Sequence, residues 1–325
     1  MKVQSNRRLW TQGALALAMA WALPALAQEF PQKPLKMIVP FAAGGPVDAV
    51  ARDLAVKLGE KLGQSVVVDN IGGGAGLPAM QALARANADG HTMILAGASH
   101  VTIQTLLTKA GADAASKLEP VSLVSTSPHV LFVSSKLPVK TLQEFIDYAK
   151  ARPGQLNYAS AGTGSVSHLG MEVINAQAGI KAAHVAYRGT SQATVDLAGG
   201  QVQYMLSSMA SLKDLVAKDV VRPLALTSAT QAADSKHLPL VASVLPEASY
   251  TTWYAMYVPL GTPAAASGRL NKALADVLAE PEFKAKFREQ GTDLQASSPK
   301  ELVARTQAEI RLWKKAIEQS GITVD

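Results

Sequence analysis

Two glycine-rich turns contain the residues of this chain that are best suited to binding chemistry. The first, Gly44-Gly45-Pro46, lies between an apolar run of β-strand type at residues 35–39 and a stretch with helical spacing of apolar residues at 48–62. Where a strand passes into a helix through such a turn, backbone N–H groups are exposed, and the helix start favours negative charge. The turn contains no nucleophile, metal ligand or phosphate-binding lysine. We therefore predict that it holds an anion and leaves it chemically unchanged.

The second turn, within residues 158–169, repeats this order of strand, small residues and helix. Ser165 or Ser167 can cap the helix, while Gly162 and Gly164 leave N–H groups open to a ligand. An ordinary strand-to-helix turn is the alternative interpretation, since many glycine-rich loops bind nothing. Two such turns in one chain favour the binding interpretation.

Further polar candidates follow other predicted strands. In open α/β sheets, ligands bind at the carboxyl ends of strands, which is where these residues would lie. Arg188 can pair bidentately with a carboxylate, whereas a solvated surface arginine is the alternative that the sequence leaves open. The candidates are Ser99 with His100, the run Tyr187-Arg188-Gly189-Thr190, and Ser207-Ser208.

Catalytic interpretations have weaker support. Ser165, His168 and Asp196 are the residue types of a hydrolase triad, but no G-x-S-x-G elbow surrounds a serine. The 6 histidines include no i,i+4 pair and no cluster with metal-ligand spacing. Residues 74–79 imitate a dinucleotide fingerprint, but they begin beyond the strand end and lack the later acidic residue that holds a ribose. We expect no enzymatic activity, no cofactor and no metal.

The N-terminus has the composition of an export signal. Lys2, Arg7 and Arg8 precede an apolar run at residues 14–23, and Ala-Leu-Ala at 25–27 is a small-x-small cleavage site. Cleavage near Ala27 is therefore predicted. A membrane anchor, the alternative, would need about 20 apolar residues. The arginine pair also leaves twin-arginine export open beside the ordinary secretory route.

The amino-acid composition limits the cellular compartments and the classes of binding partner that the protein can have. The net charge of +6 falls to +3 when the three basic residues of the predicted signal are removed, and no Lys/Arg cluster with interleaved aromatics suggests a nucleic-acid partner. The count of 0 cysteines excludes disulfides, iron–sulfur clusters and thiolate-zinc sites. No second apolar run approaches membrane length. These features fit a protein exported to a bacterial periplasm.

Short β-type runs alternate with helical patterns over most of the chain. This alternation predicts α/β structure with βαβ units and a parallel or mixed sheet covered on both sides. The last third instead predicts two long amphipathic helices, at residues 263–290 and 299–320. The predicted strands cover residues 35–39, 65–69, 92–96, 121–125, 130–133, 156–159, 183–186, 202–206, 224–227 and 253–258.

Two strand-like passages, at residues 121–133 and 224–228, bracket a middle section with its own βαβ series. This arrangement predicts two lobes joined by crossing strands. Lobe 1 would comprise residues 28–128 and 227–325, and lobe 2 residues 129–226.

Motifs spread along the chain resemble those of one family. The chain is similar to the periplasmic solute-binding proteins of tripartite tricarboxylate transporters, the Bug (Bordetella uptake gene) family, and the resemblance covers essentially the whole mature chain. The matching elements are Pro40-Phe41, Gly44-Gly45, Asp48, Ala51-Arg52, Val66-Val67-Val68, Asn70, Gly72 to Gly76, Asp89-Gly90, residues 153–162, Gly164-Ser165, His168-Leu169, His184-Val185, Tyr187-Arg188-Gly189, residues 199–202, residues 225–228 and Gly261-Thr262-Pro263.

The resemblance implies a two-lobe, type II periplasmic binding (Venus flytrap) fold in which the lobes close over a ligand carboxylate held by main-chain groups of both turns. It implies capture of a small di- or tricarboxylate or aromatic acid for membrane transporter subunits; a ligand sensor that acts on a signalling protein is the alternative. A monomer is expected. With Ser99 added from its strand end, the predicted ligand-binding residues are Phe41, Ala42, Ala43, Gly44, Gly45, Asp48, Thr163, Gly164, Ser165, His168, Tyr187, Arg188, Gly189 and Ser207.

Several positions depart from the family pattern. Pro46-Val47 replaces the glycine-threonine usual before the aspartate, which removes a hydroxyl from the predicted pocket rim. Ile71 stands where an arginine commonly follows the asparagine, Ala186 replaces a proline, and Arg188 replaces a lysine. With fewer polar donors at Val47, we predict a preference for a less polar acid, such as an aromatic or longer-chain one.

Overall fold

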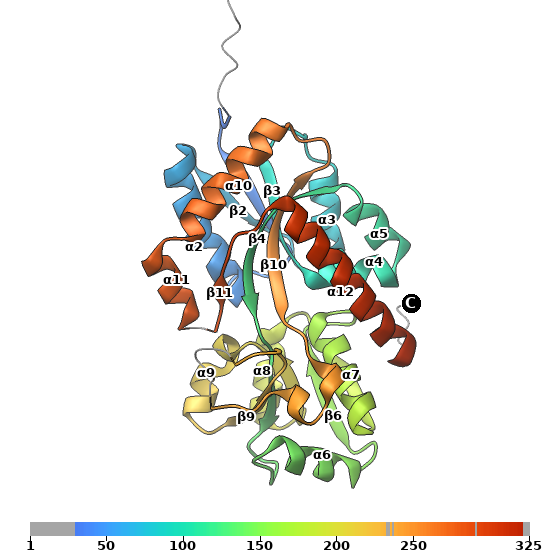
Figure 1. The fold of residues 1–325 in the computed structure, drawn as a ribbon. Coiled ribbons are helices and arrows are strands. Elements are labelled where there is room, and N and C mark those ends of the chain that lie inside the picture. Colours follow the sequence, from blue (N-terminus) through green and yellow to red (C-terminus); the bar gives the residue numbers. More distant parts are fainter. Residues whose placement is uncertain (1–29, 232–234, 236, 290, 321–325) are drawn as a thin grey trace, which may run out of the picture.

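The computed structural model describes residues 30–231, 235, 237–289 and 291–320, so the predicted signal peptide lies outside the described residues. The chain forms two lobes, each built on its own sheet (Figure 1). The larger sheet has six strands in the order β11-β4-β10-β3-β1-β2, and the smaller has five in the order β7-β6-β8-β5-β9. The two-lobe α/β architecture predicted from the sequence is confirmed.

The larger sheet and its helices form the first lobe. Strand β1 pairs in parallel with β2 on one side and β3 on the other, while β10 pairs antiparallel with β3 and β4. The strands are β1 (Leu35–Val39), β2 (Val66–Asn70), β3 (Thr92–Gly97), β4 (Leu118–Ser127), β10 (Thr252–Pro259) and β11 (Asp293–Leu294). The helices are α2 (Pro46–Leu62), α3 (Leu77–Ala84), α4 (Gln104–Leu107), α5 (Lys109–Ala115), α10 (Ala264–Leu278), α11 (Pro281–Arg288) and α12 (Pro299–Ser320).

Successive residues of β1 are buried against helices on opposite faces of this sheet. Met37 joins a buried cluster with Leu54 of α2 and Leu274 of α10, whereas Ile38 joins the cluster that contains Met80 and Leu83 of α3. Because side chains alternate along a strand, burial on both faces requires consecutive apolar residues, and residues 37–39 supply them after the exposed Lys36.

The smaller sheet forms the second lobe. Strand β6 pairs in parallel with β7 and β8, and β5 is antiparallel to β8 and β9. The strands are β5 (Val130–Ser134), β6 (Leu156–Ser160), β7 (Ala182–Ala186), β8 (Tyr204–Ser207) and β9 (Val221–Leu226). The helices are α6 (Leu142–Lys150), α7 (Val166–Ala178), α8 (Thr190–Gly199) and α9 (Met209–Ala217).

The part of the chain that the structure describes crosses between the lobes twice, and the two crossings are hydrogen-bonded to each other. The backbone N–H of Thr227 donates to the carbonyl of His129 at 2.9 Å, and that of Tyr250 donates to the carbonyl of Thr227 at 2.7 Å. Leu240, between these points, forms a bridge with Leu226 of β9. The lobe limits given by the sequence stay a prediction.

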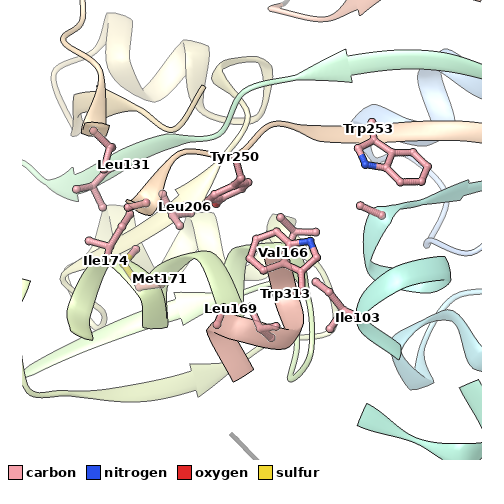
Figure 2. Close-up of a cluster of buried hydrophobic side chains, with 14 of the residues drawn as sticks. Ile103, Leu131, Val166, Leu169, Met171, Ile174, Leu206, Tyr250, Trp253 and Trp313 are labelled. Atoms are coloured by element: carbon pink, nitrogen blue, oxygen red, sulfur yellow. The ribbon is translucent and has the colours of Figure 1, made fainter. Parts of the chain in front are cut away.

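The C-terminal helix α12 joins both lobes. It packs against β4 and the π-helical turn Ser99–Ile103 in the first lobe and against α7 in the second. Figure 2 shows Trp313 of α12 beside Tyr250, with the ring centroids 5.3 Å apart. A single buried cluster therefore runs through both lobes at this point.

The C-terminal third differs from the prediction in one respect. The helix expected over residues 263–290 is two helices, because α10 ends at Leu278 and α11 begins at Pro281. Proline cannot continue a helix but is favoured in its first turn. The predicted amphipathic character is seen in the structure, where Leu270 of α10, Phe287 of α11 and Trp313 of α12 are all buried. Among the described residues, none of the helices combines the length and apolar character needed to cross a membrane.

Candidate functional site

The predicted binding residues lie at the carboxyl ends of parallel strands in both lobes. In the first lobe, residues 41–45 follow β1 and Ser99 follows β3. In the second, residues 163–165 follow β6, residues 187–189 follow β7, and Ser207 ends β8. We call these two sets of loops the interlobe loops, because Gly164 of the second lobe lies against α4, which follows the Ser99 turn of the first lobe.

The first turn leads into a helix that begins without a side-chain cap. Gly45 is the N-cap of α2, and no described side chain accepts a hydrogen bond from the helix start. Pro46 at the first helical position has no N–H, so the donors of the first turn belong to the residues that follow it. Ala42, Ala43 and Gly44 are exposed. An exposed, uncapped helix start attracts an anion.

Asp48 fixes the position of this turn from within. Its Oδ2 accepts hydrogen bonds from the backbone N–H of Gly44 and from Arg52 Nε, each at 2.9 Å, and its Oδ1 accepts from Asn70 Nδ2 at 2.9 Å. Burial alone would raise the pKa of Asp48, but the hydrogen bonds from Arg52, Gly44 and Asn70 outweigh it and hold the pKa below its usual value. Because both oxygens are engaged, Asp48 positions the turn.

The loops after β2 and β3 pack on the first turn. The ring of Phe41 lies 5.2 Å from that of His100, edge to face. A Cβ on Gly72 would lie 2.9 Å from the backbone nitrogen of Ala42, and one on Gly76 would overlap the His100 ring at 2.1 Å. Only glycine permits these close approaches. The imidazole is fully buried, and burial lowers the pKa of His100 to about 4.

The second turn leads into a helix that is capped by a side chain. Ser165 is the N-cap of α7, and its Oγ accepts from the backbone N–H of His168 at 3.2 Å. The backbone N–H of Gly164 donates to Nδ1 of His168 at 3.2 Å, and that of Ala161 donates to Ser167 Oγ at 3.1 Å. Several polar groups of this turn are thus engaged within the protein.

Two stacked histidines lie beneath the second turn. The rings of His168 and His184 are 3.9 Å apart, and Tyr158 stacks on His184 at 4.9 Å. Nε2 of His184 lies 2.6 Å from Ser160 Oγ, which accepts from the backbone N–H of Gly162 at 3.1 Å. Burial, with the neighbouring His184 ring, lowers the pKa of His168 to about 4, and burial does the same for His184. Both rings are therefore neutral at pH 7.

The remaining candidates of the second lobe differ in their environment. Tyr187 donates from its hydroxyl to Asp196 Oδ2 at 2.6 Å, and burial together with that carboxylate raises the pKa of Tyr187 to about 12. Arg188 is exposed. Ser207 is 1 % exposed, and its hydroxyl has no hydrogen-bond partner among the described residues. A buried hydroxyl without a partner is costly, so Ser207 is the strongest candidate for a ligand contact in this lobe.

The lobes touch where α4 meets the second turn. A Cβ on Gly164 would lie 2.8 Å from Nε2 of Gln104 and 2.9 Å from Cδ1 of Leu107. Neither Gln104 nor Leu107 is among the residues predicted from the sequence. The only sequence signal for Gln104 is a polar residue within an apolar stretch, which does not distinguish burial from exposure.

The structure does not assemble the alternative catalytic sites. Asp196 is hydrogen-bonded to Tyr187, and the Oγ of Ser165 accepts from the backbone of His168, so these residues do not form a serine–histidine–aspartate relay. Gly74 to Gly76 form a 3-10 turn that covers His100. In the part of the chain that the structure describes, no group of three or more acidic or histidine side chains could hold a metal ion.

Two hollows lie outside the interlobe loops. One, of about 300 Å³, lies between α7, the segment at residues 246–250 and α12. The other, of about 380 Å³, lies where β1 and β3 begin and is lined by Lys33, Arg85 and His91, among others. Neither includes a predicted binding residue.

Comparison with known proteins identifies the family. Residues 50–322 match the family TctC, described as "Tripartite tricarboxylate transporter family receptor". The chain belongs to this family. It is 31 % identical over 303 residues to "Protein BugT" of Bordetella pertussis, which covers 92 % of this chain and 93 % of that protein. The family expected from the sequence motifs is therefore confirmed.

Solved structures agree with the TctC assignment. "R. palustris Rpa4515 with adipate" has a TM-score of 0.86 at 32 % identity and covers 91 % of this chain and 99 % of its own. "Structure of periplasmic binding protein BugD" has a TM-score of 0.83 at 30 % identity and covers 90 % and 99 %. "MatC (Rpa3494) from Rhodopseudomonas palustris with bound malate" has a TM-score of 0.82 at 28 % identity and covers 89 % and 100 %. TctC proteins are periplasmic solute-binding proteins.

Within this TctC chain, the predicted residues fall into two groups. Residues 41–45, Asp48 and Ser99 gather in the first lobe around Phe41 and His100. Residues 163–165, His168 and Tyr187 gather in the second, where the backbone N–H of Tyr187 donates to the Ser160 carbonyl at 3.2 Å. Their role as ligand contacts stays a prediction.

Proposed function

We propose that this chain is a periplasmic solute-binding protein that captures a small carboxylate between its lobes and delivers it unchanged to a tripartite tricarboxylate-type transporter. During export, the N-terminal signal would be cleaved near Ala27. The interlobe residues predicted above would contact the ligand, with the uncapped start of α2 and the unpartnered hydroxyl of Ser207 as the main donors.

The chemistry of the interlobe loops supports an anion as the ligand. Helices α2 and α7 both begin at these loops, and a helix start carries a partial positive charge. The α2 start lacks a side-chain acceptor, so a carboxylate oxygen can take that place. Relatives whose structures contain adipate and malate support a small acid with one or more carboxylates.

The observation that carries the proposal is the Ser207 hydroxyl. It is buried at the interlobe end of β8 and lacks a partner among the described residues. Ser134 offers a matched contrast: its hydroxyl is also buried without a described partner, but it lies at the other end of the neighbouring strand β5, since Val130 is the residue that pairs with Ser207.

Calorimetric titration of the mature chain with adipate, malate and a panel of mono-, di- and tricarboxylates tests the proposal. We expect Ser207→Ala to weaken binding of the preferred acid about tenfold, because it removes one hydrogen bond to a charged group. Its thermal stability should not fall, because the hydroxyl has no partner to lose. Ser134→Ala should leave the affinity unchanged.

Mass spectrometry of the recovered ligand completes the test. The acid should return with unchanged mass after incubation, since binding without conversion is proposed. Failure of every acid in the panel to bind, or recovery of a modified product, would refute the proposed function. Equal effects of Ser207→Ala and Ser134→Ala would remove Ser207 from the site.

A further inference from the structure

Gln104 is a buried polar side chain at the interlobe surface with no described hydrogen-bond partner. It begins α4 and is only 5 % exposed, although glutamine usually lies at the surface. Its main-chain carbonyl accepts from the backbone N–H of Thr108. Its side-chain amide forms no hydrogen bond with the described residues and is not one of the fully enclosed unpaired atoms there, so it stays within reach of a ligand. A side-chain amide offers two donors and one carbonyl acceptor, and buried groups of this kind are normally satisfied.

The amide lies directly against the second turn. The amide nitrogen of Gln104 is 2.8 Å from the point where a Cβ on Gly164 would lie. The amide fits there because Gly164 has no side chain. The turn itself is held firmly, because Gly164 has φ +74° and its N–H donates to His168. Leu107, one helical turn later, makes the neighbouring apolar contact with Gly164. Gln104 is therefore a polar group of the first lobe placed at the binding surface of the second.

We propose that Gln104 is a specificity-determining residue that hydrogen-bonds a second polar group of the bound acid, at the end that approaches the Gly162–Ser165 turn. This inference rests on the proposed function. The amide donates to a carboxylate and can both donate to and accept from a hydroxyl or carboxamide. An acid with an alkyl end would leave the amide unpaired, and sites built to hydrogen-bond a group strongly reject ligands that lack it. The preferred ligand is thus a bifunctional acid.

A pure closure contact between the lobes is the competing explanation. If Gln104 only touched Gly164 when the lobes close, its replacement would change the affinity of every ligand by the same factor. A ligand contact changes the affinity of bifunctional acids selectively. The ratio of two affinities therefore separates the two explanations.

Adipate and hexanoate form a matched pair for this measurement, because they have the same six-carbon chain and differ in one terminal carboxylate. Titration of the mature chain should show tighter binding of adipate than of hexanoate. Gln104→Leu, which has nearly the same volume, should reduce that preference about tenfold by weakening adipate binding alone. Gln143→Leu is the control, since Gln143 is exposed on α6 and should change neither affinity.

Gln104→Glu is a second variant, which keeps a polar group at this position but gives it a negative charge. Its carboxylate should repel the second carboxylate of adipate and weaken binding more than leucine does. It should instead favour 6-aminohexanoate, which carries an ammonium group at the same position. Melting temperatures of both variants near that of the unmodified chain exclude misfolding as the cause.

Several results would overturn the inference. An unchanged ratio of adipate to hexanoate affinity in both variants, or equal weakening of both ligands, would leave Gln104 without a role in specificity while the proposed function stands. Preferential binding of hexanoate by the unmodified chain would also overturn it. Failure of the unmodified chain to bind any carboxylate would refute the proposed function and the inference together.

Discussion

The two glycine turns share one layout but are held by different chemistry. In the first lobe, the Asp48 carboxylate gathers Gly44, Arg52 and Asn70 through charged hydrogen bonds. In the second lobe, two neutral stacked histidines, His168 and His184, support the turn. The order of strand, turn and helix is thus the same in both lobes. The groups that hold the turn are ionic in the first lobe and uncharged in the second.

The starts of the two helices differ in the same way. Helix α2 begins at Gly45 with no side-chain acceptor, whereas α7 begins at Ser165, whose hydroxyl accepts from the helix backbone. The first lobe therefore leaves the start of its helix without a side-chain acceptor, while in the second lobe side chains already accept from the N–H groups of Gly164 and His168. Under the proposed function, this difference gives the lobes unequal roles: the first lobe would supply the anion-binding helix start, and the second would supply a shaped wall with the Ser207 hydroxyl.

Removal of Asp48, which forms the ionic support of the first turn, should have the largest effect on stability. Asp48→Ala leaves the Gly44 N–H, Arg52 and Asn70 without their shared acceptor, so we expect a loss of about 3 kcal/mol in the free energy of unfolding. Urea unfolding monitored by circular dichroism measures this change. Arg52→Ala is the control and should cost less, because the Arg52 side chain is 54 % exposed. Equal losses would show that the ion pair, rather than the whole network, supports the turn.

Mild acid should lower the stability of the protein, because it protonates the stacked histidines that support the second turn. The pKa of His168 and that of His184 are lowered to about 4, while an unfolded histidine titrates near 6.5. The unfolded chain therefore binds more protons, and stability falls as the pH drops from about 6.5 to about 4. The pKa of Asp48 lies below its ordinary value, so its carboxylate stays ionised in this window. We expect the melting temperature to fall by several degrees between pH 7 and pH 4.5.

A double variant assigns this acid sensitivity to the stacked pair. His168→Asn with His184→Gln keeps a polar group near each ring nitrogen and removes the titration. Its melting temperature should vary less with pH than that of the unmodified chain. Some dependence should remain, because burial also lowers the pKa of His100 and that of His129 to about 4. Identical pH profiles would mean that the stacked pair does not contribute.

Loss of the α7 cap should have a smaller effect. Ser165→Ala removes the acceptor for the His168 N–H, and we expect it to lower the free energy of unfolding by about 1 kcal/mol. Ser208 is a matched control: it is the N-cap of α9, but its hydroxyl accepts no hydrogen bond from the helix backbone and lies instead 2.8 Å from Ser211 Oγ. Ser208→Ala should therefore change stability by only a few tenths of a kcal/mol. A comparable loss in both variants would show that the cap at Ser165 is not the relevant interaction.

Much of the fold could be predicted because it is encoded locally. The apolar run of β1 and the helical spacing after Asp48 each describe a segment that can be recognised without its neighbours, and the observed bounds agree closely. The break between α10 and α11 is also local, since Pro281 marks it. The two-lobe arrangement was predicted from the strand-like passages at residues 121–133 and 224–228 that bracket the middle section, and the family motifs added the type II periplasmic binding fold.

The supports of the site could not be predicted because they join residues far apart in sequence. The ring contact between His168 and His184 depends on how β7 lies beside α7, and the Asn70 bond to Asp48 depends on the pairing of β1 with β2. Gln104 meets Gly164 only when the lobes are in contact. Residue type and spacing identify a turn that can bind an anion. They do not show which polar groups of that turn are already hydrogen-bonded within the protein.

The difference between the two helix starts can be removed by one substitution. Gly45 has extended backbone angles, φ −84° and ψ 170°, and a Cβ there would lie 3.7 Å from its nearest neighbour, the Ala42 carbonyl oxygen, so serine fits without strain. Gly45→Ser places a hydroxyl acceptor at the start of α2, and we expect stability to rise by a few tenths of a kcal/mol. The same hydroxyl competes with a ligand for the helix N–H groups.

Carboxylate affinity should therefore fall in Gly45→Ser although the protein becomes more stable. Calorimetric titration and urea unfolding of the same sample measure both changes, and Gly45→Ala separates the hydroxyl from the added carbon, since alanine cannot accept a hydrogen bond. If Gly45→Ser bound carboxylates as well as the unmodified chain, the N–H groups at the α2 start would not be ligand donors. The first lobe would then resemble the second in contributing shape, and the charge of the ligand would have to be met by side chains.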